Sequence, residues 1–404
     1  MKEITGGVCA AKGYKAAGIR CGIRKNQTKK DLALIVSDQR AAAAAVYTCN
    51  LVKSAPIKVT KANLADGYAQ AVICNSGIAN TCRAEGVEMA ERMCALVETA
   101  CGIPAEDVIV GSTGVIGAPL PIEIIEAGMP DLTAALGEDN SADAEAAIMT
   151  TDTVPKEYAV EFSVDGVPCR MGGIAKGSGM IHPNMATMLV FITCDAAVSP
   201  EMIRKSLSDN VKTTFNMVSV DGDTSTNDMV SVMCNGAAGN APITGPGAGY
   251  DAFDEALRAV MTGLCKMIAA DGEGASKFLE CTVSGADTYE DAALAAKSVI
   301  CSSLFKAAMF GADANWGRAL CAIGYSGAKV DVERVDMTFR SAAGEILVCR
   351  NGAGVDFSED LAKTILSEKE IYIDISVGDG PHSATAWGCD LTYEYVHING
   401  DYRS

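Results

Sequence analysis

The sequence lacks the residue clusters that hold structural zinc. Its 404 residues contain only three histidines, and its 16 cysteines never form a C-x-x-C motif. Structural zinc sites need four Cys or His ligands at close spacings, so a zinc module is not expected. Cysteines dispersed along a long chain are instead typical of a reduced, cytoplasmic protein.

Long hydrophobic runs and long basic runs are also missing. The strongest apolar run, residues 185–194, has only about the length of a strand, well short of the roughly 18 residues that span a membrane. Glycines and charged residues interrupt the N-terminus, so no signal peptide is predicted. The chain has 33 Lys and Arg against 51 Asp and Glu, and its net charge of −18 disfavours nucleic acid and anionic membranes as partners. We therefore expect a cytoplasmic protein that binds neither.

The residues that are present favour a layered α/β fold. Hydrophobic residues make up 49% of the chain and charged residues 21%, as in ordinary globular proteins, and the length predicts roughly two to three domain-sized units. Apolar runs of strand length, at 71–74, 107–110 and 188–192, alternate with helical periods, of which the clearest covers 253–268. After about residue 330 the pattern becomes rich in strands. This alternation predicts an α/β or α+β structure.

One segment, residues 175–189, combines several unusual residues. Its glycines, Gly177 and Gly179, permit an unusual backbone path, and Pro183-Asn184 forces a turn. The small Ala186 and then Thr187 follow, at the start of a buried strand. The residues alone leave three interpretations open: a tight turn, a phosphate loop without the usual G-x-x-x-x-G-K-[ST] motif, and a self-cleaving site. In a self-cleaving site the Thr hydroxyl attacks the preceding carbonyl, and the α-amine that the cut releases becomes its base.

Two further loops carry polar groups in glycine-rich surroundings. Residues 111–114 form a G-S-T-G turn after an expected strand, where a backbone N–H and the Thr113 hydroxyl can point at a developing oxyanion. Isolated G-S-T-G turns also commonly have only a structural role. The acidic run 219–228 suggests a calcium loop, but Gly222 stands at the second loop position instead of the sixth, so we expect a structural loop.

The segment 176–196, KGSGMIHPNMATMLVFITCDA, closely resembles the self-cleavage site of the ornithine acetyltransferase family, the glutamate N-acetyltransferases of the cyclic arginine pathway. Further blocks in the same order extend the resemblance over nearly the whole chain. These blocks are GGVCAAKGYKAAGI, GSTGVIG, TTDTVPK, SVDGDTSTND, ADGEGASK, GADANWGR and HINGDYRS. An ordered series of blocks is far more specific than any one of them, so the sequence is identified as a member of this family.

Three positions depart from the residues that the family usually carries. Ile78 stands where Asn is usual, and Ser276 and Ser404 stand where Thr is common. The two serines keep the hydroxyl group. Ile78, in contrast, removes a polar group from a loop that the resemblance places near the rim of the active site.

The resemblance implies an N-terminal-nucleophile-like αββα sandwich with a smaller C-terminal α/β part. It also implies cleavage between Ala186 and Thr187. The products would be an α chain, 1–186, with the oxyanion-hole and substrate loops, and a β chain, 187–404, with the nucleophile, a substrate-binding loop and the C-terminal tail. The chains are expected to stay together as an α2β2 heterotetramer.

The implied activity is ping-pong transfer of an acetyl group from N2-acetyl-L-ornithine to L-glutamate in arginine biosynthesis. Thr187 matches the family's nucleophile, and Thr113 and Gly114 match its oxyanion hole. The residues that match its substrate contacts are Thr150, Lys176, Thr187, Glu273, Asn399 and Ser404. No metal or cofactor is expected. Family members differ in whether acetyl-CoA also donates acetyl groups, and no residue of this sequence decides the question.

Two other functions stay open at this point. An N-terminal-nucleophile amidase or aminopeptidase cleaves itself in the same way but passes the acyl group to water. The matched substrate contacts Lys176, Glu273 and Asn399 argue against it. A glycine-rich nucleotide-binding protein would remain one intact chain, and a lone G-x-G is weak support for it.

Overall fold

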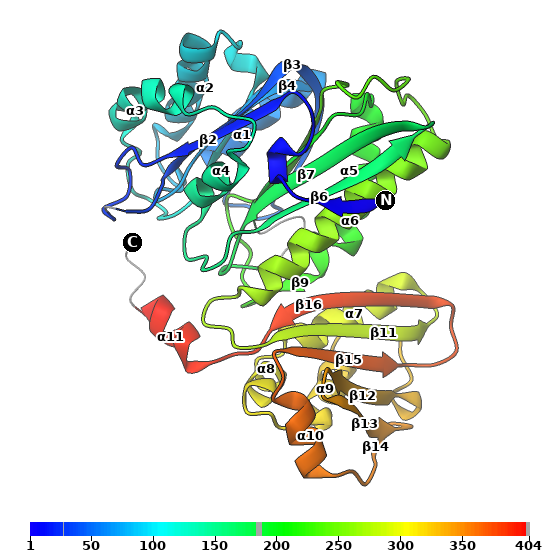
Figure 1. Ribbon diagram of the computed structural model, residues 1–404. Coiled ribbons are helices and arrows are strands. Elements are labelled where there is room, and N and C mark those ends of the chain that lie inside the picture. Colours follow the sequence, from blue (N-terminus) through cyan, green and yellow to red (C-terminus); the bar gives the residue numbers. More distant parts are fainter. Residues whose placement is uncertain (27, 183–187, 401–404) are drawn as a thin grey trace.

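The structure is a computed structural model that describes residues 1–26, 28–182 and 188–400. Two β-sheets with helices packed on them form two units, one above the other in Figure 1. The larger sheet has the order β1-β6-β7-β8-β10-β3-β4-β5, with β2 beside β3. Its strands are β1 (Lys2–Ile4), β2 (Tyr14–Ile19), β3 (Leu32–Tyr47), β4 (Tyr68–Asn75), β5 (Val108–Ser112), β6 (Glu157–Val164), β7 (Val167–Lys176), β8 (Leu189–Cys194) and β10 (Met229–Cys234).

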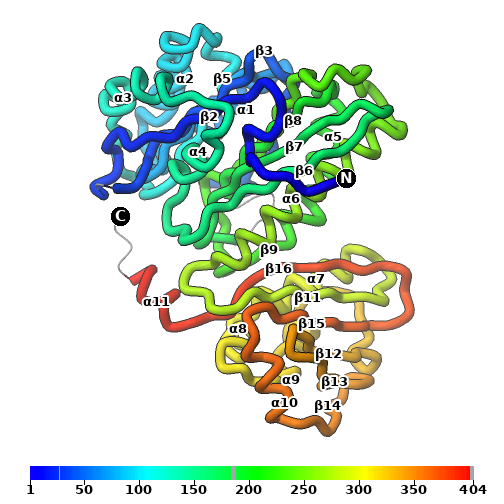
Figure 2. Tube along the Cα trace, in the orientation of Figure 1, coloured from blue at the N-terminus to red at the C-terminus, as the bar shows by residue number. Residues whose placement is uncertain are grey.

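The smaller sheet belongs mainly to the C-terminal part of the chain. Its strand order is β14-β13-β12-β15-β11-β16-β9. The strands are β9 (Val218–Ser219), β11 (Phe278–Ala286), β12 (Asp336–Ser341), β13 (Gly344–Arg350), β14 (Ala353–Gly354), β15 (Glu370–Ser376) and β16 (His382–Cys389). The chain then turns back, and Figure 2 shows the red α11 between the smaller sheet and the larger unit.

Helices cover both sheets. The α-helices are α1 (Ala55–Asn63), α2 (Gly86–Cys101), α3 (Ile122–Ala134), α4 (Ser141–Ile148), α5 (Pro200–Thr213), α6 (Ala248–Ala270), α7 (Tyr289–Cys301), α8 (Ser303–Phe310), α9 (Trp316–Gly324), α10 (Glu359–Leu366) and α11 (Tyr393–Gly400). The 3-10 helices are Gly7–Cys9, Leu64–Asp66, Ala105–Asp107, Phe215–Met217 and Val332–Arg334. Within the described ranges no single helix is long and apolar enough to cross a membrane, and only the bent pair α7–α8 meets that test when both helices are taken together.

The central strand β8 separates two hydrophobic cores. Val190 and Ile192 belong to the core that contains α5 and α6, whereas Leu189 and Phe191 belong to the core that contains α4. A strand that is apolar on both faces is typical of a sheet covered on both sides. The strand predicted at 188–192 is therefore confirmed, and it lies parallel to β10 and antiparallel to β7.

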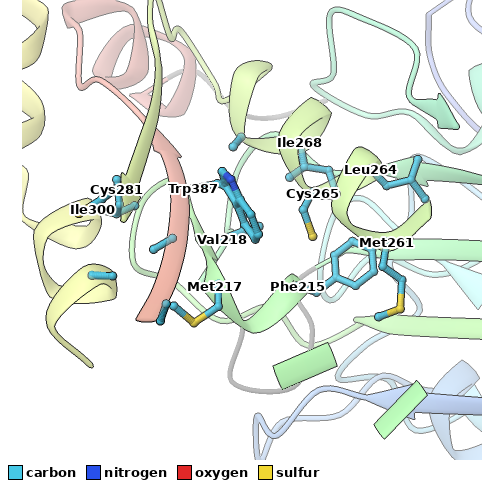
Figure 3. Packing of buried hydrophobic residues seen from close by; sticks show 14 of the residues in the cluster. Phe215, Met217, Val218, Met261, Leu264, Cys265, Ile268, Cys281, Ile300 and Trp387 are labelled. Atoms are coloured by element: carbon cyan, nitrogen blue, oxygen red, sulfur yellow. The ribbon is translucent and has the colours of Figure 1, made fainter. Parts of the chain in front are cut away.

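Helix α6 connects the two units. The apolar period predicted at 253–268 falls on one buried face of this helix, which confirms it. Figure 3 shows Cys265 and Ile268 of α6 beside Trp387 of β16, with Leu264 farther away along the helix, and all four belong to one continuous core that runs from the larger sheet to the smaller one. Leu264 also packs over β7, where a Cβ added at Gly173 would lie 3.2 Å from the Leu264 Cδ1 atom.

The predicted layered α/β class is confirmed, with the smaller unit at the C-terminal end as expected. The expected cleavage position, between β7 and β8 in the sequence, lies outside the described residues. Both of these strands pair in the same sheet, and β10 likewise pairs with β3. Residues from both sides of the expected cut therefore form one hydrogen-bonded sheet.

Because α6 joins the two units, we predict that Leu264→Ala lowers the free energy of unfolding by about 3–5 kcal/mol, the usual loss for a fully buried leucine that leaves a cavity. Urea unfolding followed by circular dichroism measures it. Leu304→Ala on α8 is the control, because Leu304 is 65% exposed and its loss should change the stability by less than about 0.5 kcal/mol. Equal effects of the two substitutions would contradict the role of α6.

Candidate active site

Six of the predicted site residues line one pocket. The pocket holds about 620 Å³ of empty space, its open mouth included. Its described lining consists of Thr113, Gly114, Ile116, Thr150, Thr151, Lys176, Gly179, Met180, Ser225, Thr226, Asn227, Glu273 and Asn399. The predicted Ala186, Thr187 and Ser404 lie outside the described residues. Segments far apart in the sequence, from β5 to α11, thus meet at one place.

The turn after β5 brings Thr113 and Gly114 to the pocket wall. The Thr113 N–H donates to the Asn75 carbonyl at 3.0 Å, which extends the pairing of β4 with β5 into the turn. Gly114 has φ +127°, and a Cβ there would lie 2.3 Å from the backbone of Gly77. Only glycine fits this close approach of two backbones. The turn is therefore fixed by packing, and both residues face the pocket.

Ile78 does not disturb this wall. Its backbone bridges Thr113, and its side chain packs against the apolar cluster under α1, α2 and α3. The side chain is absent from the described pocket lining. The second departure, Ser276, uses its hydroxyl to bind the Asp390 carboxylate and its N–H to bind the same group at 2.8 Å. Both unusual residues thus have structural partners.

A buried ion cluster holds Thr150 in place. The Lys156 ammonium group, 1% exposed, lies 2.8 Å from Asp152 and 2.5 Å from Asp271. Asp152 also accepts hydrogen bonds from the backbone N–H of Thr150 at 2.9 Å and of Gly177 at 2.7 Å. One carboxylate therefore fixes the backbone beside two predicted substrate contacts, Thr150 and Lys176.

The charges around Asp152 keep it ionised. Burial alone would raise the pKa of this carboxyl, but the cations Lys176 and Lys156 and the hydrogen bonds outweigh burial and hold the pKa well below its usual range. Asp228, the other buried carboxyl near Lys176, behaves in the opposite way. Burial raises its pKa well above the usual value, and its Oδ2 atom has no hydrogen-bond partner among the described residues. The two buried carboxyls near Lys176 thus have pKa values shifted in opposite directions.

Glu273 lies in the loop that follows α6. Its N–H donates to the Ser178 carbonyl at 2.9 Å, and its carboxylate accepts from the Asn399 side chain on α11 at 2.7 Å. A Cβ at Gly179 would lie 2.3 Å from the Glu273 carboxylate carbon, so a side chain there would displace this carboxylate. The described lining thus contains a cation, Lys176, and a carboxylate, Glu273, as a zwitterionic amino acid would need.

The loop 219–228, predicted to be structural, has that role and also lines the pocket. The Asn227 side chain donates to the carbonyls of Ala79 at 2.6 Å and Ser112 at 2.7 Å, which ties the loop to the turn after β5. Sequence reasoning missed Asn227, Thr226 and Ser225 as lining residues. Their position in a family-like block was the available signal, but the block did not say which side chains point inward.

His182 is not among the residues of the described pocket lining. Its Nδ1 atom lies 3.2 Å from the Ser219 hydroxyl and 3.4 Å from the Cys301 sulfur. Burial first, and then the Lys297 cation, lower the pKa of His182 to about 4. In the ranges that the structure describes, no group of three or more His, Cys, Asp or Glu side chains is placed to hold a metal ion.

We predict that Asp152→Asn destabilises the protein by about 3 kcal/mol at neutral pH, because it removes one of the two carboxylate charges that compensate the buried Lys156 ammonium group. Since folding depresses the pKa of Asp152, its stabilisation is complete above the unfolded value of about 3.9 and is lost as the pH falls through the lower folded value. The difference from the parent protein should therefore be constant from about pH 6 to 8 and shrink below about pH 4.

Urea unfolding at several pH values measures this difference. The exposed Asp209 pairs with Lys205 at 2.9 Å and provides the control, since Asp209→Asn should cost less than about 1 kcal/mol. A loss for Asp152→Asn that stays the same down to pH 2 would contradict the role assigned to its charge.

Comparison with known proteins assigns this architecture to a family. The profile of the ArgJ family matches residues 15–404. The "Arginine biosynthesis bifunctional protein ArgJ" of Symbiobacterium thermophilum is 50% identical over 406 residues, covering 100% of both chains. The protein of the same name from Caldanaerobacter subterraneus subsp. tengcongensis is 48% identical over 405 residues, again covering 100% of both.

A crystal structure of the Bacillus halodurans arginine biosynthesis bifunctional protein ArgJ is also similar. Its sequence is 42% identical, and the TM-score is 0.50. The match covers 98% of that solved chain but 52% of this one. With a family profile over almost the whole length and full-length relatives at about half identity, this chain belongs to the ArgJ family.

Proposed function

We propose that this protein transfers the acetyl group of N2-acetyl-L-ornithine to L-glutamate in arginine biosynthesis. The observation that carries the proposal is the convergence of Thr113, Gly114, Thr150, Lys176, Glu273 and Asn399 on one pocket. The names of the relatives, arginine biosynthesis bifunctional proteins, support the same activity. Both substrates are α-amino acids with a free α-carboxylate, so the pocket cation Lys176 suits both.

We propose that the chain first cuts itself between Ala186 and Thr187, which gives an α chain, 1–186, and a β chain, 187–404. Sheet pairing between β7 and β8 and between β3 and β10 would hold the products together. The solved relative supports such a cut, because 98% of its chain matches only 52% of this one, as a chain divided near the middle would. Two α and two β chains are proposed to assemble as α2β2.

Acetyl transfer then proceeds in two steps. The α-amine of Thr187 takes the proton of its own hydroxyl, whose oxygen attacks the acetyl carbonyl of acetylornithine. Thr113 and Gly114 donate hydrogen bonds to the oxyanion, the C–N bond breaks, and ornithine leaves with the proton on its α-amine. The α-amine of glutamate attacks the acetyl-Thr187 ester in the same way, and N-acetylglutamate is released. No metal or cofactor takes part in either step.

The two charged groups of the pocket are proposed to bind different parts of the substrates. Lys176 is proposed to bind the α-carboxylate that both amino acids share, beside Thr150 and the tail residue Ser404. Glu273, held by Asn399 at 2.7 Å, is proposed to face the side-chain amine of ornithine. Glutamate carries a carboxylate at that end, so Glu273 attracts the donor and not the acceptor.

A second donor, acetyl-CoA, is favoured by the word bifunctional in the names of the relatives. The purified protein should therefore be offered acetylornithine plus glutamate and, separately, acetyl-CoA plus glutamate. Acetyl release from acetylornithine that does not depend on glutamate would instead identify an amidase or aminopeptidase. Failure to form N-acetylglutamate from acetylornithine would refute the proposed function.

We predict that the purified protein consists of two fragments that end and begin at residues 186 and 187, and that Thr187→Ala remains one chain of 404 residues. The substitution removes the hydroxyl that attacks the preceding carbonyl. Mass spectrometry measures the fragments. Thr151→Ala is the control, since Thr151 also has a pocket hydroxyl and should leave cleavage intact. Cleavage of the Thr187→Ala protein at the same bond would contradict intramolecular attack.

We predict that Glu273→Gln lowers kcat/KM for acetylornithine about tenfold to a hundredfold, the effect of losing a hydrogen bond to a charged group. The value for glutamate should fall less or rise, because a like charge is removed. Varying one substrate at a time in the ping-pong assay separates the two values. Glu394→Gln, exposed on α11, should change neither. Equal losses for both substrates would show that Glu273 contacts a group that they share.

A further inference from the structure

A second hollow lies behind the wall of the proposed active site. We call it the cationic groove, and it encloses about 980 Å³ of empty space, its open mouth included. Its described lining consists of Leu51, Val52, Lys53, Ala55, Lys58, Asn80, Cys82, Arg83, Ala84 and Val87. The segment before α1, the start of α1 and the loop before α2 thus form its sides.

The charge of this groove is opposite to that of the whole molecule. It contains Lys53, Lys58 and Arg83, and its described lining includes no acidic side chain, although the chain carries a net charge of −18. Lys53 donates to the Thr48 carbonyl at 2.7 Å, and Arg83, 38% exposed, pairs with Glu85 just outside the groove. Ala55, the first residue of α1, adds the positive end of a helix dipole. The groove is therefore suited to anionic groups.

Apolar side chains stand beside these cations. Leu51 is 96% exposed and Val52 48% exposed, and Val87 at the start of α2 completes the apolar part. A ligand that covers these exposed aliphatic side chains removes apolar surface from water, which favours binding. Cations and exposed aliphatic groups in one hollow match a ligand that combines phosphate groups with an apolar ring.

The groove and the active-site pocket share a wall. The Ser54 N–H donates to the Thr226 carbonyl at 2.9 Å, and the Thr81 hydroxyl donates to the Asn227 side chain at 2.9 Å. Thr226 and Asn227 line the pocket on the other side of these bonds. At the rim, the Gly117 N–H donates to the Thr81 carbonyl at 3.0 Å, next to the pocket residue Ile116.

We propose that the cationic groove binds the nucleotide end of coenzyme A when acetyl-CoA is the acetyl donor. The diphosphate and the 3′-phosphate face Lys53, Lys58 and Arg83, and the adenine ring covers Leu51 and Val52. The pantetheine arm then follows the shared rim at Ile116 to the pocket, where the acetyl group is transferred. This inference rests on the proposed second donor, and acetylornithine, which has no phosphate, does not use the groove.

The test is the double charge reversal Lys58→Glu plus Arg83→Glu in the full, self-cleaved enzyme. Both side chains are exposed, so the fold is expected to persist. The KM for acetyl-CoA should rise at least about tenfold, because two contacts to phosphate are replaced by repulsion. The kcat/KM for acetylornithine should stay within about twofold.

A matched variant controls for net charge. Lys205→Glu plus Lys212→Glu makes the same charge change on α5, where the two side chains are 56% and 62% exposed. It should leave both donors unaffected. Equal losses for both donors in the groove variant, or an unchanged KM for acetyl-CoA, would overturn the proposal.

Direct binding separates this inference from the proposed function. Calorimetry with 3′-phosphoadenosine 5′-diphosphate should show binding to the parent enzyme that weakens at least about tenfold in the groove variant and that falls with added salt. Inorganic phosphate at the same concentration should not displace the nucleotide, since it lacks the adenine contacts. If the parent enzyme binds no nucleotide, the proposed role of the cationic groove is wrong, even if acetylornithine is a donor. If the parent enzyme does not use acetylornithine as a donor, the proposed function is refuted. The nucleotide titration still tests whether the groove binds coenzyme A.

Discussion

The buried ammonium group of Lys156 fixes the segments from which the pocket is built. An unpaired charge at a side chain 1% exposed would cost several kcal/mol, so the fold must bring carboxylates to it. Asp152 comes from the same loop, whereas Asp271 comes from the end of α6, 115 residues later. Through Asp152 the backbone beside Thr150 and Lys176 is fixed, and through Asp271 the loop that carries Glu273 begins at a defined place.

The same constraint bears on a chain that is proposed to cut itself. Lys156 and Asp152 precede the expected cut and Asp271 follows it, so the ion cluster joins the two products, as the pairing of β7 with β8 does. Helix α6 adds a continuous apolar core between the larger and the smaller sheet (Figure 3). A cut in the connection between two paired strands leaves all of these contacts intact, and cleavage therefore need not separate the chains.

The pocket and the cationic groove distribute charge in a way that suits their proposed ligands. The pocket lining includes both a cation, Lys176, and a carboxylate, Glu273, which suits the proposed donor acetylornithine, because its carboxylate and side-chain amine carry opposite charges. In the groove, Lys53, Lys58 and Arg83 stand without an acidic neighbour in the described lining, which suits phosphate. The wall between them is a network of hydrogen bonds around Asn227. The two proposed donors, which differ in charge, would then reach the proposed nucleophile by different routes.

The sequence by itself determined the local elements and most of the candidate site. The apolar periods predicted β8 and α6, because hydrophobic spacing is a property of neighbouring residues, and the family-like blocks identified Thr113, Lys176 and Glu273. The tertiary structure alone decided how Lys156 meets Asp271, how Asn227 supports the turn after β5, and that the Ile78 side chain packs into an apolar cluster. These contacts join residues far apart in the chain. No local sequence pattern specifies which distant carboxylate will pair with a buried charge, or which distant carbonyl will accept a hydrogen bond from a buried amide.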